Sequence, residues 1–385
     1  MRSASMIVFV VVCVSIALVF VSAAGAQEEA VPIAPPEPIV PEPPPVAPVV
    51  PDFDFEAGVP ANWYARWGEA TTQITQLPEN VRGGMGALEC FYTPFCRLAC
   101  RDLVPQPAAR SIRFSLKTME PTNMEYGVIE ADGSTYQGLC YVPGGAWQQI
   151  ALDLSELVLA QDSEDENGQL DVDQINEVFV GDLANLPGEV GEALGQKMGQ
   201  QTLWLDDVKL SPDIAPSRAG AAGPGGLILD SFDGPQANCL AIGGAELDLA
   251  PAAAGQPGAL QVTYSLGAGR WIGFVTGVGH LNLAGVTGLK MRMRAPQGTS
   301  LVLVLEERDG TKYETRLELA GGEQWEDLTF PIQNFILDDD SEDENGLLDL
   351  PQMRVMIVLA DMLTSGVDAL GKGSLVVDEI AFTAQ

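Results

Sequence analysis

Hydrophobic and polar residues alternate along short segments of this chain, and turn signals separate those segments. Every second residue is apolar in SIRFSLK (111–117) and in GLKMRMR (288–294). Such alternation places one face of a β-strand on a core and the other face in water. Asp132-Gly133 and Asp309-Gly310 are strong hairpin-turn signals that follow alternating segments. The pattern predicts an all-β fold in which antiparallel sheets pack face to face.

The pattern occurs twice, because residues 52–210 and 227–384 carry matching landmarks in the same order. The matching pairs are GALECFYT (86–93) with GALQVTYS (258–265), EADGSTY (130–136) with ERDGTKY (307–313), DSEDENG (162–168) with DSEDENG (340–346), and LWLDDVKL (203–210) with LVVDEIAF (375–382). We infer an internal duplication. It predicts two tandem β-sandwich domains, 52–210 and 227–385, joined by a linker rich in Pro, Gly and Ala at 211–226.

The amino-terminal region does not continue this pattern. Arg2 is the only charge before an apolar run that ends in Ala24-Gly25-Ala26, which is typical of a signal peptide (1–26) cleaved before Gln27. An uncleaved membrane anchor is the alternative interpretation. Ten of the residues 32–51 are proline, so 27–51 is expected to be an extended linker. We therefore expect an exported protein that is secreted, periplasmic or held at the cell surface.

Charge narrows the range of partners. The chain has 53 acidic and 20 basic residues, which gives a formal net charge of −33. Nucleic acid and anionic lipid bind positive surfaces, so neither is an expected partner. Cations, neutral sugars and basic proteins stay open.

Five cysteines follow the signal segment, namely Cys90, Cys96, Cys100, Cys140 and Cys239. In an exported protein, disulfides or buried thiols are expected here rather than metal ligands, because the spacing is not a usual zinc pattern. His280 is the only histidine, so any Ser-His-Asp or Cys-His site would depend on it. Paired carboxylates stay open in so acidic a chain, but no strand-end acid is singled out. We expect a non-catalytic protein.

The order of the motifs carries a resemblance to a known family. An opening F-[ED] is followed by G-A-L-x-[CV]-x-Y, E-x-D-G-x-x-Y, D-x-N-G-x-L-D and a closing L-x-[VL]-D-[DE]-[IV]. This order resembles the galactose-binding-like jelly-roll domains, and is most similar to family 11-type carbohydrate-binding modules and complex I intermediate-associated-type domains. The resemblance covers nearly all of both copies. It implies a jelly roll that is often calcium-stabilised, often non-catalytic, and often binds a glycan on its concave sheet.

The repeated acidic phrase is a candidate calcium site. Thirteen of the 53 acids lie in residues 162–173 and 338–349, and such crowding is relieved by water, salt or a cation. The spacing of Asp, Asn, Gly and Asp fits part of a calcium loop. The candidate ligands are Asp165, Asn167 and Asp171 in the first copy and Asp343, Asn345 and Asp349 in the second. The bidentate glutamate of an EF-hand is missing, so a solvated Asx-type turn is the alternative interpretation.

The resemblance implies a second cation site in each copy. In similar modules an acid after the first strand and an aspartate in the last strand share a structural ion. The corresponding residues here are Glu56 with Asp206 or Asp207, and Asp233 with Asp378 or Glu379. Ordinary exposed acid pairs at the sheet ends are the alternative.

Aromatic side chains are the candidates for sugar stacking. Trp147 and Trp325 match across the copies and begin strands, so both are expected in the cores. The unmatched residues Trp67, Tyr126 and Trp271 are the better candidates for carbohydrate binding.

Two functions are consistent with these features. The first is a secreted or surface-tethered, non-catalytic protein whose tandem jelly rolls bind an extracellular polysaccharide or glycan. The alternative is a structural or adhesion protein of the cell envelope, with an envelope or extracellular protein as its partner. An exposed aromatic row on a concave sheet favours the first, and a face of small or aliphatic residues favours the second.

Overall fold

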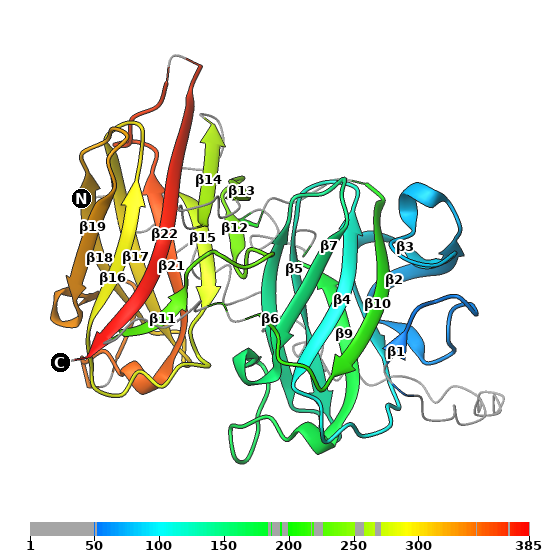
Figure 1. Ribbon diagram of the computed structural model, residues 1–385. Helices are drawn as coiled ribbons and strands as arrows, with labels where there is room; N and C mark the ends of the chain where they lie inside the picture. The colour runs from blue at the N-terminus through cyan, green and yellow to red at the C-terminus, as the bar shows by residue number, and fades with distance from the viewer. Residues whose placement is uncertain are drawn as a thin grey trace, which may run out of the picture.

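The computed structural model describes residues 50, 52–183, 186, 193–194, 199–216, 218, 226–250, 258–265, 271–343, 345–368 and 370–384. The signal peptide expected at 1–26, nearly all of the proline-rich segment and most of the linker expected at 211–226 lie outside the described residues. Two β-sandwiches stand side by side in Figure 1, the first drawn in blue to green and the second in yellow to red. No helix within the described ranges is long and apolar enough to cross a membrane.

The described part of domain 1 contains ten strands. They are β1 (Asp52–Phe53), β2 (Trp63–Thr75), β3 (Ala87–Cys100), β4 (Ser111–Thr118), β5 (Thr122–Glu130), β6 (Thr135–Val142), β7 (Gln148–Asp153), β8 (Val158–Leu159), β9 (Ile175–Asp182) and β10 (Gln201–Ser211). Short 3-10 turns lie at η1 (Pro78–Asn80), η2 (Leu154–Glu156) and η3 (Val172–Gln174).

One long strand ties the two layers of domain 1 together. The first half of β3 pairs with β10, and its second half pairs with β9. The hydrogen-bonded order β7-β4-β10-β3-β9-β5-β6-β8 therefore folds over at β3 into two layers. We call β7-β4-β10 with the first half of β3 the back sheet, and the second half of β3 with β9, β5, β6 and β8 the front sheet. Their facing side chains form the core, which includes Leu88, Leu98, Leu116 and Val128.

Domain 2 repeats the plan with two separate sheets. Its strands are β11 (Gly226–Asp230), β12 (Leu240–Ile242), β13 (Glu246–Ala250), β14 (Ala259–Ser265), β15 (Trp271–Gly277), β16 (Val286–Arg294), β17 (Thr299–Glu307), β18 (Lys312–Leu319), β19 (Glu326–Pro331), β20 (Ile336–Leu337), β21 (Met353–Asp361) and β22 (Lys372–Ala384), with 3-10 turns η4 (Ile332–Asn334) and η5 (Leu350–Gln352). The back sheet has the order β13-β14-β22-β16-β19, with β11 beside β22. The front sheet has the order β12-β15-β21-β17-β18-β20.

The duplication inferred from sequence is visible in the strand order. β4 and β16 are the alternating segments, and each pairs with the last long strand of its domain, β10 or β22. The Asp-Gly signals close the β5–β6 and β17–β18 hairpins. Glycine is required there, because Gly133 and Gly310 have φ of 100° and 92°. The prediction of two antiparallel β-sandwiches is confirmed.

The front sheet of domain 2 is closed by domain 1. Its outer face is aliphatic apart from Trp271 and includes Val302, Val304 and Ile357, all at most 1% exposed. These residues form one buried cluster with leucines of domain 1 that follow β9, among them Leu183 and Leu194. Because its outer face is covered, β21 is buried along its whole length. The two sandwiches therefore form a single packed unit rather than two free modules.

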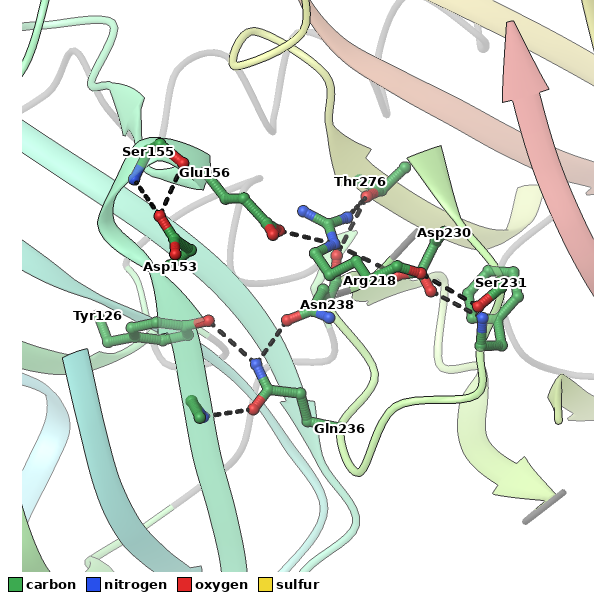
Figure 2. A network of polar contacts seen from close by, with 12 residues as sticks. Tyr126, Asp153, Ser155, Glu156, Arg218, Asp230, Ser231, Gln236, Asn238 and Thr276 are labelled. Carbon is green, nitrogen blue, oxygen red and sulfur yellow. Dashed lines mark hydrogen bonds and ion pairs between the residues drawn. The ribbon is translucent and has the colours of Figure 1, made fainter. Parts of the chain in front are cut away.

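A segment of domain 2 also enters the open side of domain 1. The peptide N–H of Tyr141 in β6 donates to the carbonyl of Ala237 at 3.1 Å. Gln236 accepts from the N–H of Ala151 in β7 at 2.7 Å and contacts the Tyr126 hydroxyl at 3.2 Å. Gln236 thus connects the two layers of domain 1 from outside that domain (Figure 2).

The interdomain linker contributes a buried cation. Figure 2 shows the Arg218 guanidinium between the two domains. Its Nε lies 3.4 Å from Asp230 Oδ2 in domain 2 and 3.7 Å from Glu156 Oε2 in domain 1. Its Nη2 donates to the Thr276 hydroxyl at 3.0 Å. Arg218 is 7% exposed, so it is a buried charge that pairs with an acid of each domain, and we call this arrangement the clamp.

Candidate functional site

The outer face of the front sheet in domain 1 carries a charged row across three strands. The strand register places Arg97 of β3 opposite Gly181 of β9, and Gly181 opposite Glu125 of β5. Residues opposite one another in antiparallel strands share a face. A Cβ on Gly181 would lie 2.7 Å from Glu125 Oε1, so glycine leaves the room that the pair needs. Arg97 and Glu125 form a bidentate ion pair with both contacts at 2.6 Å.

Aromatic rings lie on either side of the Arg97 guanidinium. Its carbon lies 3.5 Å from the centre of the Trp67 ring and 4.5 Å from the centre of the Phe179 ring. Phe179 stands opposite Ala99 and Gly127, whose small size accommodates the ring. Stacking on a cation and a bidentate carboxylate fix the orientation of Arg97. Trp67 is thus held by a rigid support.

The end of this face at β2 reaches solvent. Tyr64 and Trp67 are partly exposed. The Tyr64 hydroxyl donates to Glu177 Oε2 at 2.9 Å, and Arg66 Nη1 donates to the same oxygen at 2.8 Å. Arg101 lies over the Tyr64 ring at 5.1 Å. Partial burial and then the neighbouring Glu177 raise the pKa of Tyr64, so its phenol stays protonated. We call Tyr64, Arg66, Trp67, Arg101 and Glu177 the edge platform.

The structure separates the three aromatic residues that sequence analysis grouped. Trp67 lies on the edge platform, as a partly exposed ring. The prediction for Tyr126 is wrong as an exposed platform, because this ring is 0% exposed and packs edge-on against Phe114 in the core. The prediction for Trp271 is wrong for a similar reason, because this ring is 1% exposed in the interdomain cluster.

Two further tryptophans also differ from expectation. Trp147 and Trp325 are not core residues, since both are partly exposed. The guanidinium of Arg294 lies 4.7 Å from the centre of the Trp325 ring. Trp147 and Trp325 match across the copies because both stand directly before a strand, β7 or β19, at the surface of a sheet and not in a core.

The acidic phrase is an Asx turn with the same hydrogen bonds in both copies. In the first copy the N–H of Asn167 donates to Asp165 Oδ1 at 3.0 Å, and Asn167 Nδ2 donates to Asp171 Oδ2 at 3.2 Å. The corresponding contacts of the second copy are Asn345 N–H to Asp343 at 3.1 Å and Asn345 Nδ2 to Asp349 at 3.0 Å. The side-chain amides of Asn167 and Asn345 are therefore hydrogen-bonded to an aspartate of their own turn. The Asx-type turn, one of the two interpretations of the phrase, is therefore present, and calcium binding by these residues stays a prediction.

The first copy also brings together three carboxylates that sequence analysis did not combine. Ligand atoms of Glu130, Asp132 and Asp165 all lie within 4.8 Å of one another. Glu130 and Asp132 come from the β5–β6 hairpin, and Asp165 comes from the acidic phrase. The Tyr136 hydroxyl donates to Asp165 from β6. Burial, and then the charges of Asp165 and Asp132, raise the pKa of Glu130 to about 7.

Glu130 and Asp132 were visible in the sequence as the E-x-D-G landmark, which we used only as a turn signal. The hairpin and the acidic phrase lie about thirty residues apart, and only the fold places them in contact. The second copy has the same residue types in Glu307, Asp309 and Asp343. Among the described residues, only the triad of the first copy meets the 4.8 Å spacing.

The second predicted cation site differs between the copies. In domain 1, Glu56 Oε1 accepts from Met85 N–H at 2.7 Å, and Asp206 Oδ2 accepts from Gly83 N–H at 3.2 Å. The loop between η1 and β3 therefore supplies backbone donors to both acids. Burial raises the pKa of Asp206 despite these donors.

In domain 2 a guanidinium occupies the corresponding position. Asp378 Oδ2 lies 2.9 Å from Arg292 Nη1, and Asp233 Oδ1 accepts from Gly258 N–H at 2.7 Å. The alternating segments align Arg292 with Ser115 of domain 1. The Arg292 guanidinium therefore lies beside Asp378 at the position where similar modules hold a structural ion.

The cysteines are buried thiols. Cys90, Cys96, Cys100, Cys140 and Cys239 are free and buried. The Cys90 and Cys96 side chains are hydrogen-bonded to one another, and that contact together with burial raises the pKa of Cys90 far above its usual value. Deep burial raises the pKa of Cys140 in the same direction. Of the two expectations for these residues, the structure shows buried thiols.

No protein-family model matches the chain, and no curated protein matches it. Among similar solved structures is the family 11 carbohydrate-binding module of the cellulase Lic26A-Cel5E of Clostridium thermocellum, with 15% identity over 43% of this chain and 97% of that chain and a TM-score of 0.32. The tandem CBM22 domains of Paenibacillus barcinonensis Xyn10C have 15% identity over 89% of this chain and 100% of that chain, with a TM-score of 0.29. An exo-β-agarase has 17% identity over 43% of this chain and 25% of that chain, with a TM-score of 0.32. Modules and enzymes are both among these similar structures, and at these identities none of them names a ligand for this chain.

Proposed function

We propose that this protein binds carbohydrate at the edge platform of domain 1. The carrying observation is the pair of partly exposed rings, Tyr64 and Trp67, which stand beside hydrogen-bonding side chains on a rigid sheet. Apolar faces of sugar rings stack on flat aromatic side chains, and hydroxyls bond to polar groups around them. Arg66 and Glu177 offer donors and acceptors next to both rings.

The ligand proposed is a neutral polysaccharide or glycan. Each arginine at or beside the platform has an acid partner: Arg66 pairs with Glu177, Arg101 lies 3.6 Å from Asp102, and Arg97 pairs with Glu125. These residues therefore give the platform no excess of positive charge. The net charge of −33 opposes the approach of a polyanion. The hydroxyl groups of a neutral sugar both donate and accept hydrogen bonds. They can therefore bond to the arginine and the glutamate of an ion pair without adding a charge.

The two domains have different roles in this proposal. The front sheet of domain 2 is aliphatic and covered, so it offers no aromatic row to a glycan. Domain 2 is then a support that packs against domain 1, and each chain has one edge platform. Avidity between two equivalent sites, which tandem modules often provide, does not operate within one chain.

We also propose that calcium binds the triad Glu130, Asp132 and Asp165. Carboxylate oxygens are the ligands that calcium prefers, and three of them converge here. Burial, and then the neighbouring charges of Asp165 and Asp132, raise the pKa of Glu130 to about 7, so a proton on Glu130 relieves the crowding when no ion is bound. Calcium would supply rigidity by joining the β5–β6 hairpin to the acidic phrase. The copy-two acids and the Glu56–Asp206 set are weaker candidates, because only the triad has this spacing among the described residues.

Export and the lack of catalysis belong to the same proposal. The segment 1–26 is typical of a signal peptide, and the proline-rich segment after it would hold the sandwiches away from a surface. His280 is the only histidine, and no obvious triad partner stands beside it in the sequence. A binding protein outside the cytoplasm accounts for these features.

Affinity gel electrophoresis tests the proposal. The purified protein is run with calcium through gels that contain β-glucans, xylans, mannans or acidic polysaccharides. We expect retardation by a neutral polymer, and we expect Trp67→Ala to abolish it. Trp325→Ala is the matched control, because it removes another partly exposed tryptophan that stacks on arginine in domain 2. Equal loss in both variants, or retardation only by acidic polymers, would contradict the proposal.

The second candidate function is a structural or adhesion protein. Its basis is that apolar packing builds the domain junction, where domain 1 of the same chain covers the front sheet of domain 2. Absence of retardation by any polymer, with a folded protein, would move the conclusion to this function.

A further inference from the structure

A pocket lies at the junction of the two domains, next to the acidic phrase of domain 1. It has a volume of about 370 Å³, within the range of small-ligand sites. The wall from domain 1 contains η2, β8 and the end of the acidic phrase. The wall from domain 2 contains Gly279, His280 and Arg308. We call this space the junction pocket.

The two walls of the junction pocket differ in chemistry. Domain 1 contributes mainly aliphatic side chains, among them Leu154, Val158 and Leu170. Polar side chains stand beside them, namely Ser155, Gln169, His280 and Arg308. An apolar surface facing a small set of donors and acceptors is the usual arrangement of a small-molecule site.

The contact between domains brings these walls together closely. A Cβ added to Gly279 would lie 2.8 Å from Val158 Cγ1, so glycine allows β8 of domain 1 to approach this loop. The N–H of Gly279 is bonded to the Arg354 carbonyl at 3.2 Å, which fixes the loop on β21. The pocket is therefore a property of the assembled pair of domains.

His280 gives the pocket a neutral hydrogen-bonding ring. Burial, and then the positive charge of Arg218, lower the pKa of His280 to about 3, so the imidazole is uncharged at neutral pH. Its Nδ1 is buried and has no hydrogen-bond partner among the described residues. A buried polar atom without a partner is uncommon and calls for a water molecule or a ligand. The neutral ring can donate from one nitrogen and accept at the other.

We infer that the junction pocket binds one neutral sugar ring, with its apolar face on the Leu154–Val158–Leu170 wall and its hydroxyls toward His280 and Arg308. The choice of ligand rests on the proposed carbohydrate-binding function, but the site is distinct from the edge platform. An anionic ring is disfavoured, because Gly168 and Gln169 belong to the acidic phrase and place its carboxylates beside the pocket.

The single histidine makes the inference directly testable. The protein is labelled with ¹⁵N at histidine only, so the imidazole signals report His280 alone. Glucose, galactose, mannose and xylose are titrated separately, and the imidazole signals are followed by NMR. Arg308→Ala removes an exposed side chain of the pocket, and Arg316→Ala is its matched control on the next strand.

We expect a saturable shift of the imidazole signals with at least one sugar. We expect Arg308→Ala to weaken that binding at least fivefold and Arg316→Ala to leave it unchanged. An unshifted imidazole with all four sugars would overturn the inference, as would a shift that Trp67→Ala abolishes. The polysaccharide gels test the edge platform independently, because that assay does not depend on His280. Retardation in the gels with an unshifted imidazole would leave the proposed function in place and remove only the junction pocket.

Discussion

Removing the linker arginine should weaken the whole protein, because Arg218 is the buried charge between the two domains. Arg218→Met leaves the Asp230 carboxylate 5% exposed without its guanidinium. At an effective dielectric constant of about 20, charges 3.4 Å apart attract by roughly 5 kcal/mol before desolvation is counted. Breaking a buried pair by deleting one partner costs about 3–5 kcal/mol. We expect a loss of about 3 kcal/mol, at the low end of that range. The second acid, Glu156, lies farther from Arg218, at 3.7 Å, and keeps access to solvent, so losing its partner costs less.

Urea unfolding followed by tryptophan fluorescence at pH 7 measures this loss. Arg316→Met is the matched control on an exposed arginine, and it should change the free energy of unfolding by less than about 0.5 kcal/mol. Arg218→Met combined with Asp230→Asn should recover much of the loss, because the unpaired charge is removed. A loss below about 1 kcal/mol for Arg218→Met, or no recovery in the double variant, would refute the clamp.

Three further results are expected. Calcium at 100 times its dissociation constant should raise the melting temperature by roughly 5 °C or more, and Glu130→Gln should remove this rise, as measured by differential scanning fluorimetry. Gly279→Ala should destabilise the domain junction through its 2.8 Å contact with Val158, whereas Gly277→Ala, at 3.6 Å, should be tolerated; equal urea midpoints would contradict this. Burial raises the pKa of Glu156 from 4.5 to about 7, so its stabilising contribution is complete below pH 4.5 and is lost as pH rises through 7. Glu156→Gln should therefore flatten the pH dependence of stability between pH 5 and 8, by at most about 1.4 kcal/mol per pH unit, and an unchanged slope would contradict the assignment.

The strands and the duplication were predictable because they are local or repeated signals. Alternation in 111–117 and 288–294 fixes which residues face a core, and the Asp-Gly turns fix the hairpins. An Asx turn was one of the two interpretations of the acidic phrase, and the structure contains that turn. Asx turns depend on neighbouring residues, so the sequence contains the information for them.

The covered face of domain 2 was not predicted, because alternation reports one buried face and says nothing of what covers the other. A signal was present in β21, where MRVMIVLAD is apolar almost continuously. A continuous apolar run is typical of a strand buried on both faces. Read that way, it would have indicated that Trp271, on a neighbouring strand, is buried as well.

The candidate sites depended on long-range contacts and were predicted only in part. Trp67 lies at the edge of a sheet, where a ring can reach solvent, whereas Tyr126 occupies an inward position of a central strand. The pairing of Glu130 with Asp165 needs the β5–β6 hairpin to meet a loop from elsewhere in the domain. The types of the side chains alone do not show which distant segments come into contact.

The central claim is that the edge platform binds a neutral glycan, and calorimetric titration tests it most directly. The ligand is a soluble oligosaccharide of the polymer that retards the protein in gels, or each neutral oligosaccharide of that panel in turn. We predict that one ligand binds at the edge platform per chain, and that the dissociation constant of this site rises at least tenfold in Trp67→Ala, equivalent to about 1.4 kcal/mol. Two equivalent sites, or an affinity that Trp67→Ala leaves unchanged, would contradict the account.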